Sequence, residues 1–143
     1  MGRTTSRKHA FMLIYQSQFH EESEMSFLRE SYLEQLEQDL SESEPKEYLS
    51  NSDKRFIQGE FEGTLENLEE IDQIISENLV KWTIDRISKV DLSILRLSIY
   101  EMKFVEDIPI SVTINEAINL AHEFSGDESP SFVNGILAKV SNL

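Results

Sequence analysis

The residues best suited to chemistry in this sequence are basic and hydroxyl side chains near its beginning. The first twenty residues contain three of the 13 basic residues, Arg3, Arg7 and Lys8, and none of the 27 acidic residues. If this segment is helical, Arg3 and Arg7 are four residues apart and share a face. Together with the hydroxyls of Thr5 and Ser6 and the helix N-terminus, they could hold phosphate groups. An ordinary positively charged first turn is the alternative interpretation.

Other kinds of chemistry are not indicated. The chain has no cysteine, and its three histidines, at positions 9, 20 and 122, fit neither an HExxH zinc motif nor a di-iron motif. No glycine-rich phosphate loop and no GxSxG motif occurs. The acidic residues gather between residues 21 and 70, as is typical of a solvated helix surface rather than of a catalytic carboxylate pair. We therefore predict no enzyme, no metal and no cofactor.

The overall charge opposes strong binding of nucleic acid. The chain of 143 residues has a formal net charge of −14, and a phosphate backbone repels an acidic protein. A basic segment of this size supplies about three phosphate contacts, so we expect RNA binding to be weak unless a partner adds contacts.

Length and composition indicate a single domain with a real core. No apolar run reaches the length of a membrane-spanning helix, and no secretory signal precedes the first helix. The absence of cysteine fits a reducing compartment. We expect a cytoplasmic protein that does not associate with a membrane.

Helical periodicity runs through the whole sequence and predicts an all-α fold. Residues 5–20 and 26–40 are expected to form the first two helices, followed by a polar loop at 41–51. Asp53 is expected to cap the next helix, which should bend or break between residues 67 and 72.

The C-terminal half contains the clearest helix signals. Ser88 can cap a helix that is apolar nearly all round as far as Phe104, so this helix should lie at the centre of the fold. A capping box is expected at Thr113 and Glu116, and a last helix capped by Ser129. Within that helix we interpret Gly135 as a site where another helix approaches closely.

Three motifs in the C-terminal half resemble a known family: WTIDRI at 82–87, INEA at 114–117 and FVNGIL at 132–137. Their order and spacing are similar to those of the NusB family over about residues 79–140, and the basic first helix fits less specifically. The resemblance implies one NusB-like domain, a compact helical bundle of about six to seven helices in two helical subdomains. These subdomains would comprise about residues 1–77 and about residues 78–143.

The resemblance also implies a function. NusB proteins form a heterodimer with NusE, a small-subunit ribosomal protein that also works in transcription. Together they bind the single-stranded boxA element of nascent ribosomal RNA and help RNA polymerase pass terminators, in a larger complex with NusA and NusG. A surface used for NusE could also pair with a second copy, so a homodimer of the free protein is conceivable.

Site residues follow from the same resemblance. The RNA-binding set is expected to comprise Arg3, Thr5, Ser6, Arg7, Lys8, Glu128 and Phe132. The set facing NusE is expected to comprise Tyr15, Asp85 and Asp91. Each has a simpler alternative: Phe132 and Tyr15 as packing residues, Glu128 as a solvated turn acid, and Asp91 as a favourable charge at a helix N-terminus.

The sequence departs from the family pattern in its basic residues. The opening contains two arginines and a lysine where the family often has a denser arginine run, and Ser131 replaces a commonly basic residue before Phe132. A second hypothesis is therefore a NusB-fold protein-interaction module with little or no RNA binding of its own. NusB-like domains also occur fused to RNA cytosine methyltransferases, in which case this chain would be at most the appended domain.

Overall fold

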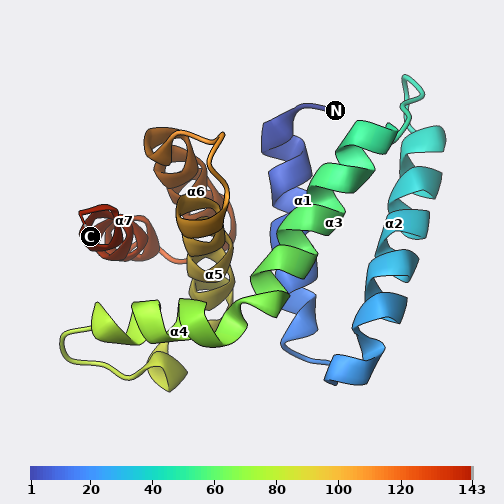
Figure 1. Ribbon diagram of the computed structural model, residues 1–143. Helices are drawn as coiled ribbons and strands as arrows, with labels where there is room; N and C mark the ends of the chain where they lie inside the picture. Colours follow the sequence, from blue (N-terminus) through green and yellow to red (C-terminus); the bar gives the residue numbers. More distant parts are fainter. Residues whose placement is uncertain (143) are drawn as a thin grey trace. The chain divides into compact units, whose positions relative to one another are not determined.

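The computed structural model describes residues 1–142, which fold into α-helices and two short 3-10 turns, with no strand among these residues (Figure 1). The predicted all-α fold is confirmed. In chain order the elements are α1 (Arg3–Ser17), η1 (Glu22–Glu24), α2 (Met25–Ser41), α3 (Asn51–Glu66), α4 (Leu68–Glu77), η2 (Ile84–Arg86), α5 (Lys89–Phe104), α6 (Ile110–Phe124) and α7 (Ser129–Ser141).

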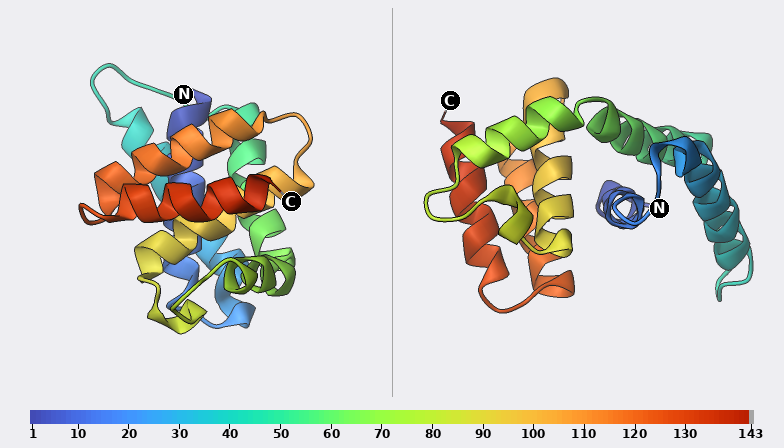
Figure 2. Two further views of the ribbon diagram at one scale, coloured as in Figure 1. Left: turned by 90° about the vertical axis from the view of Figure 1, so that its left-hand side faces the viewer. Right: turned by 90° about the horizontal axis from the view of Figure 1, so that it is seen from below.

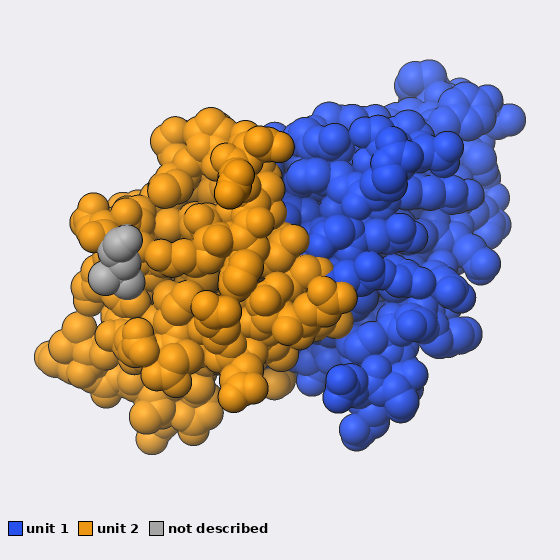
Figure 3. Space-filling model, in the orientation of Figure 1, with its two compact units in different colours: residues 1–62 blue, residues 63–143 orange. Residues whose placement is uncertain are grey.

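The helices belong to two compact units, residues 1–62 and residues 63–143 (Figure 3). We call them unit 1 and unit 2. The sequence suggested a division near residue 77. The structure groups α4 with the C-terminal helices instead, because α4 packs against α5. Helix α3 begins in unit 1, and its last turn belongs to unit 2.

Unit 1 consists of α1, α2 and most of α3, which run in alternating directions (Figure 1). Ion pairs join α2 to α3 on the surface, between Arg29 and Glu62 and between Lys54 and Glu37. These helices form because apolar residues recur at helical spacing and can be buried together. The buried apolar residues of unit 1 are Ala10, Phe11, Leu13, Ile14, Leu33, Leu36, Ile57 and Phe61.

Unit 2 is built around α5, which packs against α4, α6 and α7 (Figure 2). Nine of the sixteen residues of α5 are buried, which confirms the prediction of a central helix. A two-pronged ion pair fixes α4 to α5: Arg96 donates from Nε to Asp72 Oδ1 at 2.9 Å and from a terminal nitrogen to Oδ2 at 2.8 Å. Such bidentate geometry makes an ion pair specific as well as strong.

The predicted break between residues 67 and 72 is also confirmed. Helix α3 ends at Glu66, and α4 begins at Leu68. Between them, the Asn67 side-chain amide donates to the Gly63 carbonyl oxygen at 2.8 Å. The same carbonyl oxygen also accepts the Asn67 backbone amide at 3.2 Å, so the backbone and the side chain of Asn67 both bond to the last turn of α3.

Helix N-termini show where local sequence signals succeed and fail. Ser88 caps α5 as predicted, because its Oγ accepts a hydrogen bond from the Asp91 amide at 3.1 Å. At α3 the corresponding bond runs from the Asp53 amide to Ser50 Oγ at 3.0 Å. The prediction that Asp53 caps this helix is wrong, because α3 already begins at Asn51.

The capping box predicted for α6 is also wrong. This helix begins at Ile110 directly after Pro109, and no side chain caps it. Thr113 therefore lies inside the helix, so it cannot form a capping box with Glu116. Its hydroxyl donates instead to Oε1 of the fully buried Glu101 at 2.8 Å, which gives a buried carboxylate one of the hydrogen bonds that it needs.

Two expectations for α7 are wrong as well. Glu128 occupies the N-cap position, and Ser129 is the first helical residue rather than the cap. A Cβ atom placed on Gly135 would meet nothing within 4 Å, so no helix approaches this glycine. The close approach occurs at Gly63, where a Cβ atom would overlap the Tyr100 ring.

Candidate nucleic-acid interface

The basic segment predicted to bind phosphate forms the first two turns of α1. Gly2 is the N-cap residue and contributes no side-chain bond, and the first turn contains no acidic residue. The first amide groups of the helix therefore retain the partial positive charge that attracts anions. Arg3 and Thr5 are exposed, and Lys8 is partly exposed.

Two other residues of the predicted set are buried. Ser6 has no exposed surface, and only 5 % of Arg7 is exposed. The guanidinium carbons of Arg3 and Arg7 lie 4.4 Å and 5.5 Å from the centre of the Phe56 ring, so both cations rest on one aromatic side chain of α3. The two arginines thus share a helix face, as their spacing predicted, but that face points mainly at the protein.

Part of the Arg3 guanidinium group remains available to a phosphate. One terminal nitrogen of Arg3 donates to Ser52 Oγ at 3.3 Å, and the side chain lies at the surface. A guanidinium group has five N–H donors, and the bond to Ser52 uses one of them. Within the described residues of unit 1, Arg3 is therefore the better placed of the two arginines to meet a phosphate.

The start of the chain is tied to α3. The Met1 ammonium group donates to Asp53 Oδ2 at 3.2 Å. Partial burial opposes the charge on Asp53, but hydrogen bonds from Ser50 and from the Met1 ammonium outweigh this effect and hold the pKa of the carboxyl below its usual value. The salt link and the Phe56 ring together position the first turn of α1.

The remaining RNA-binding predictions fall in unit 2. Glu128 is exposed at the start of α7, and Phe132 lies one turn further along the helix, half-buried. The Phe132 ring stacks on the indole of Trp82, with ring centres 6.2 Å apart and planes inclined by 29°. Phe132 is therefore neither a pure core residue nor a fully open one.

Asp91 organises the loop that leads into α7. It is buried, and its two carboxylate oxygens accept hydrogen bonds from Ser125 Oγ at 2.8 Å and from Ser129 Oγ at 2.9 Å. The two hydroxyls lie 2.7 Å from each other. Of the residues predicted from the sequence, Asp91 is thereby bonded to Ser129, the residue that follows Glu128 in the chain.

The other two residues predicted to face NusE are more accessible. Tyr15 is half-buried in unit 1 and makes an edge-to-face contact with the exposed Phe19, at 5.3 Å between ring centres. Asp85 is exposed in η2, and a hydrogen bond from the Thr83 hydroxyl lowers the pKa of its carboxyl. Tyr15 lies in unit 1 and Asp85 in unit 2.

Two residues that contact the predicted set were not identified from the sequence, Phe56 and Trp82. The local sequence pattern does not distinguish Phe56 from the other apolar residues of an amphipathic helix. Trp82 had a usable signal, because the single tryptophan of the chain stands between Lys81 and Thr83 in the segment that connects α4 to α5. A large aromatic residue in such a connection is often exposed for binding.

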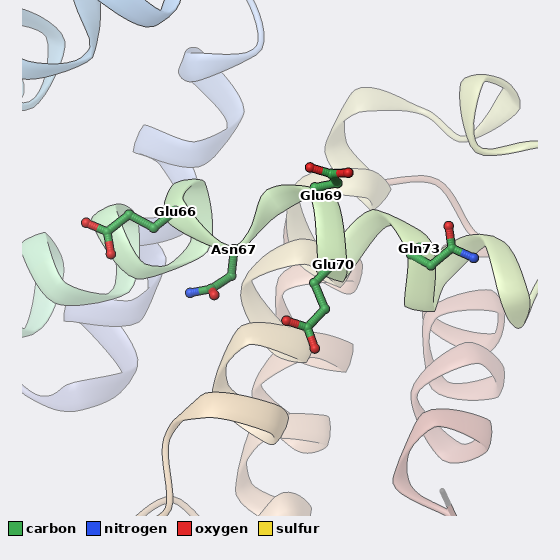
Figure 4. Close-up of a pocket in the computed structure, with 5 residues that line it drawn as sticks. All are labelled: Glu66, Asn67, Glu69, Glu70 and Gln73. Atoms are coloured by element: carbon green, nitrogen blue, oxygen red, sulfur yellow. The ribbon is translucent and has the colours of Figure 1, made fainter.

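A hollow on unit 2 does not suggest catalysis. It lies where α3 ends and α4 begins and is lined by Glu66, Asn67, Glu69, Glu70 and Gln73 (Figure 4). The side chains of Glu69 and Glu70 point in different directions (Figure 4), so they do not converge on one bound atom. Across residues 1–142, no group of three or more histidine or carboxylate side chains is arranged to hold a metal ion.

None of the helices described is both long enough and apolar enough to cross a bilayer.

Comparison with known proteins assigns the family. The model of the NusB family matches residues 4–142. The transcription antitermination protein NusB of Clostridium botulinum (strain Kyoto / Type A2) is 45 % identical over 148 residues, covering 98 % of this chain and 99 % of the relative. The protein of the same description from Acetivibrio thermocellus is 46 % identical over 140 residues, covering 98 % of this chain and 88 % of the relative.

Solved structures agree with this assignment. A structure of NusB from T. maritima superposes with a TM-score of 0.83 at 34 % identity and covers 99 % of this chain and 92 % of that one. A chain from a crystal structure of the antitermination factors NusB and NusE in complex with dsRNA has the same fold, with a TM-score of 0.80 at 21 % identity, over 98 % of this chain and 96 % of that one. The resemblance seen in the sequence motifs is therefore confirmed, and this chain belongs to the NusB family.

Proposed function

We propose that this chain is a transcription antitermination factor. Together with NusE it binds boxA-type single-stranded RNA of nascent ribosomal RNA and helps RNA polymerase read through terminators. The observation that carries this proposal is the match over nearly the whole length to proteins described as transcription antitermination proteins. A protein of the same fold has been crystallised with NusE and double-stranded RNA, which supports NusE and RNA as candidate partners; that the RNA is bound as a single strand is part of the proposal.

The chemistry of α1 supports weak RNA binding that depends on a partner. Arg3, Thr5 and Lys8 offer accessible donors beside a helix N-terminus without acidic residues, whereas Arg7 is held against Phe56. Each phosphate contact to a single strand contributes about −0.7 to the slope of log affinity against log salt. Two cations should therefore give a shallow slope, and further contacts must come from NusE or from unit 2.

The remaining parts of the proposal concern context. The chain works as a binding protein and not as an enzyme, in the cytoplasm, within a larger assembly that includes NusA, NusG and RNA polymerase. The residues proposed to meet NusE are Tyr15, Asp85 and Asp91. For Asp91 this contact would come in addition to its hydrogen bonds with two serines, so its effect on the partner can be indirect. In the absence of NusE, we propose that the chain can form a homodimer.

A titration of fluorescently labelled boxA-like RNA tests the proposal. The chain is added with and without NusE at two salt concentrations, and binding should be tighter with NusE present. Replacing Arg3 and Lys8 by Ala should weaken binding for all RNA sequences and flatten the salt slope by about one unit or more. Arg7 is left intact because its removal would also disturb packing. The control variant Lys46→Ala, in the loop after α2, should bind like the parent.

A second candidate function is a protein-interaction module of NusB fold with little RNA binding. The burial of Ser6 and Arg7 and the net charge of −14 favour it. The same titration separates the two: binding of NusE without binding of RNA, at either salt concentration, would establish the module and refute the RNA-binding role.

A further inference from the structure

The stacked rings of Trp82 and Phe132 are placed to accept a third flat ring. Phe132 is half-buried in α7, whereas 59 % of Trp82 is exposed, in the segment that runs from α4 back to α5 (Figure 2). Phe132 supports one side of the indole, which therefore presents a large apolar surface to solvent in a defined orientation. Tryptophan is one of the residue types enriched among the side chains that carry most of the energy at binding surfaces.

The sequence segment that contains Trp82 is more basic than the chain as a whole. Residues 79–89 contain Lys81, Arg86 and Lys89 and one acidic residue, Asp85, in a protein of net charge −14. Lys81 and Arg86 are exposed on either side of Trp82 in the sequence. Exposed aromatic surface interleaved with cations complements a single nucleic-acid strand, which presents flat bases and negative phosphates alternately.

Helix α7 extends this surface. Lys139 lies seven residues after Phe132, so both are on one face of α7, two turns apart. Lys139 Nζ is 3.5 Å from the Asn78 carbonyl oxygen, which places that end of the face beside the segment containing Trp82. Gly135 falls between the two and has open space where a side chain would be. The glycine of the FVNGIL motif thus leaves the helix surface clear next to the aromatic pair.

We propose that Trp82 is a base-stacking residue: an unpaired nucleobase of bound RNA lies against the indole that Phe132 supports, and Lys81, Arg86 and Lys139 meet the adjacent phosphates. This inference rests on the proposed RNA-binding function and names a contact for it in unit 2. An unpaired base is required, because both faces of a paired base in a duplex are already covered by its neighbours.

The environment of Trp82 can be followed by tryptophan fluorescence, because Trp82 is the single tryptophan of the chain. The full chain is mixed with tryptophan-free NusE, and a boxA-like RNA is titrated in while tryptophan fluorescence and anisotropy of labelled RNA are both followed. Stacking should quench the indole in parallel with the anisotropy signal. Abasic nucleotides, which keep the phosphates but lack the bases, are then introduced one position at a time. At one position the abasic RNA should bind with the quenching largely lost.

Two substitutions separate stacking from general apolar contact. Trp82→Leu keeps an apolar side chain but removes the π surface, and we expect RNA affinity to fall by roughly 5- to 100-fold, as for loss of one base–aromatic stack. Trp82→Tyr keeps a ring and should retain most of the affinity. Tyr48→Ala removes an exposed aromatic residue of unit 1 and serves as the matched control, with no expected change. Circular dichroism checks that every variant is folded.

The outcomes distinguish this inference from the function on which it rests. If RNA does not bind even with NusE present, the proposed function fails and this inference fails with it. If RNA binds but the fluorescence stays constant and Trp82→Leu binds like the parent, the stacking role alone is refuted. Quenching by NusE in the absence of RNA, with no further change when RNA is added, would assign Trp82 to the protein partner and also overturn the proposal.

Discussion

Two glycines on α3 allow the packing of α3 against Tyr100 to be measured directly. A Cβ atom on Gly63 would overlap the Tyr100 ring, whereas a Cβ atom on Gly59, one turn earlier, would meet nothing within 4 Å. Both positions are helical, so replacing either glycine by alanine gains about 1 kcal/mol from helix propensity. Only at Gly63 does the new methyl group also have to displace another side chain.

The cost of that displacement can be bounded from the structure. The Tyr100 ring stacks on Phe104, with ring centres 5.8 Å apart and planes inclined by 18°, so turning the ring away would disturb this contact. Overpacking of this kind costs about 1–3 kcal/mol. We therefore expect Gly63→Ala to destabilise the protein by about 1 kcal/mol net, as the difference between a cost of ~2 and a gain of ~1. Gly59→Ala should stabilise it by about 1 kcal/mol.

Thermal unfolding followed by far-UV circular dichroism tests this pair. For a chain of about 150 residues, 1 kcal/mol corresponds to about 2–4 °C in Tm, so the two variants should differ by about 4–8 °C and lie on opposite sides of the parent. Adding Tyr100→Leu should remove most of the penalty at Gly63. The reasoning is refuted if Gly63→Ala raises Tm as much as Gly59→Ala does, since α3 could not then be in contact with Tyr100.

Three further predictions concern individual polar contacts. Asp91→Ala leaves the hydroxyls of Ser125 and Ser129 without their charged acceptor, so the free energy of unfolding should fall by about 2–4 kcal/mol. Urea unfolding followed by Trp82 fluorescence measures this change. A decrease below about 0.5 kcal/mol would contradict the hydrogen bonds described. Because the pKa of Asp53 is lowered in the folded state, its ionised form stabilises the protein above the unfolded pKa of about 3.9, and this stability is lost as pH falls through the lower folded value. Asp53→Asn should therefore flatten the dependence of unfolding free energy on pH between about pH 5 and pH 2, and an unchanged slope would argue against the salt link. Arg96→Lys removes the bidentate pairing with Asp72 and should lower the free energy of unfolding by about 1 kcal/mol in the same assay. An unchanged free energy of unfolding would mean that a single positive charge at this position is sufficient.

The helices themselves were predictable because their cause is local. Apolar residues at a spacing of three and four along α5 identify a helix to be buried on most sides, whatever surrounds it. The break after Glu66 and the cap at Ser88 also depend on neighbouring residues, and both predictions are confirmed. The motifs from Trp82 to Leu137 identified the family for the same reason: they are contiguous patterns that can be read without knowing the fold.

The predictions that failed depend on partners distant in the sequence. Thr113 reads as a helix cap, but its hydroxyl bonds to the buried Glu101 of α5. Gly135 reads as a contact site, but the glycine that a neighbouring side chain approaches is Gly63. In each case the residue type is compatible with several roles, and the side chain that happens to lie opposite selects among them.

The same division applies to the basic segment on α1. The sequence alone determined that Arg3 and Arg7 share a helix face with no acidic residue near them. Only the tertiary structure decided that this face rests on Phe56, so that Arg7 is 5 % exposed while Arg3 remains at the surface. The charge of an arginine is a property of the residue itself. Whether that charge can meet a phosphate depends on how much of the side chain is buried when the protein folds. Burial is determined by contacts between helices that are far apart in the chain.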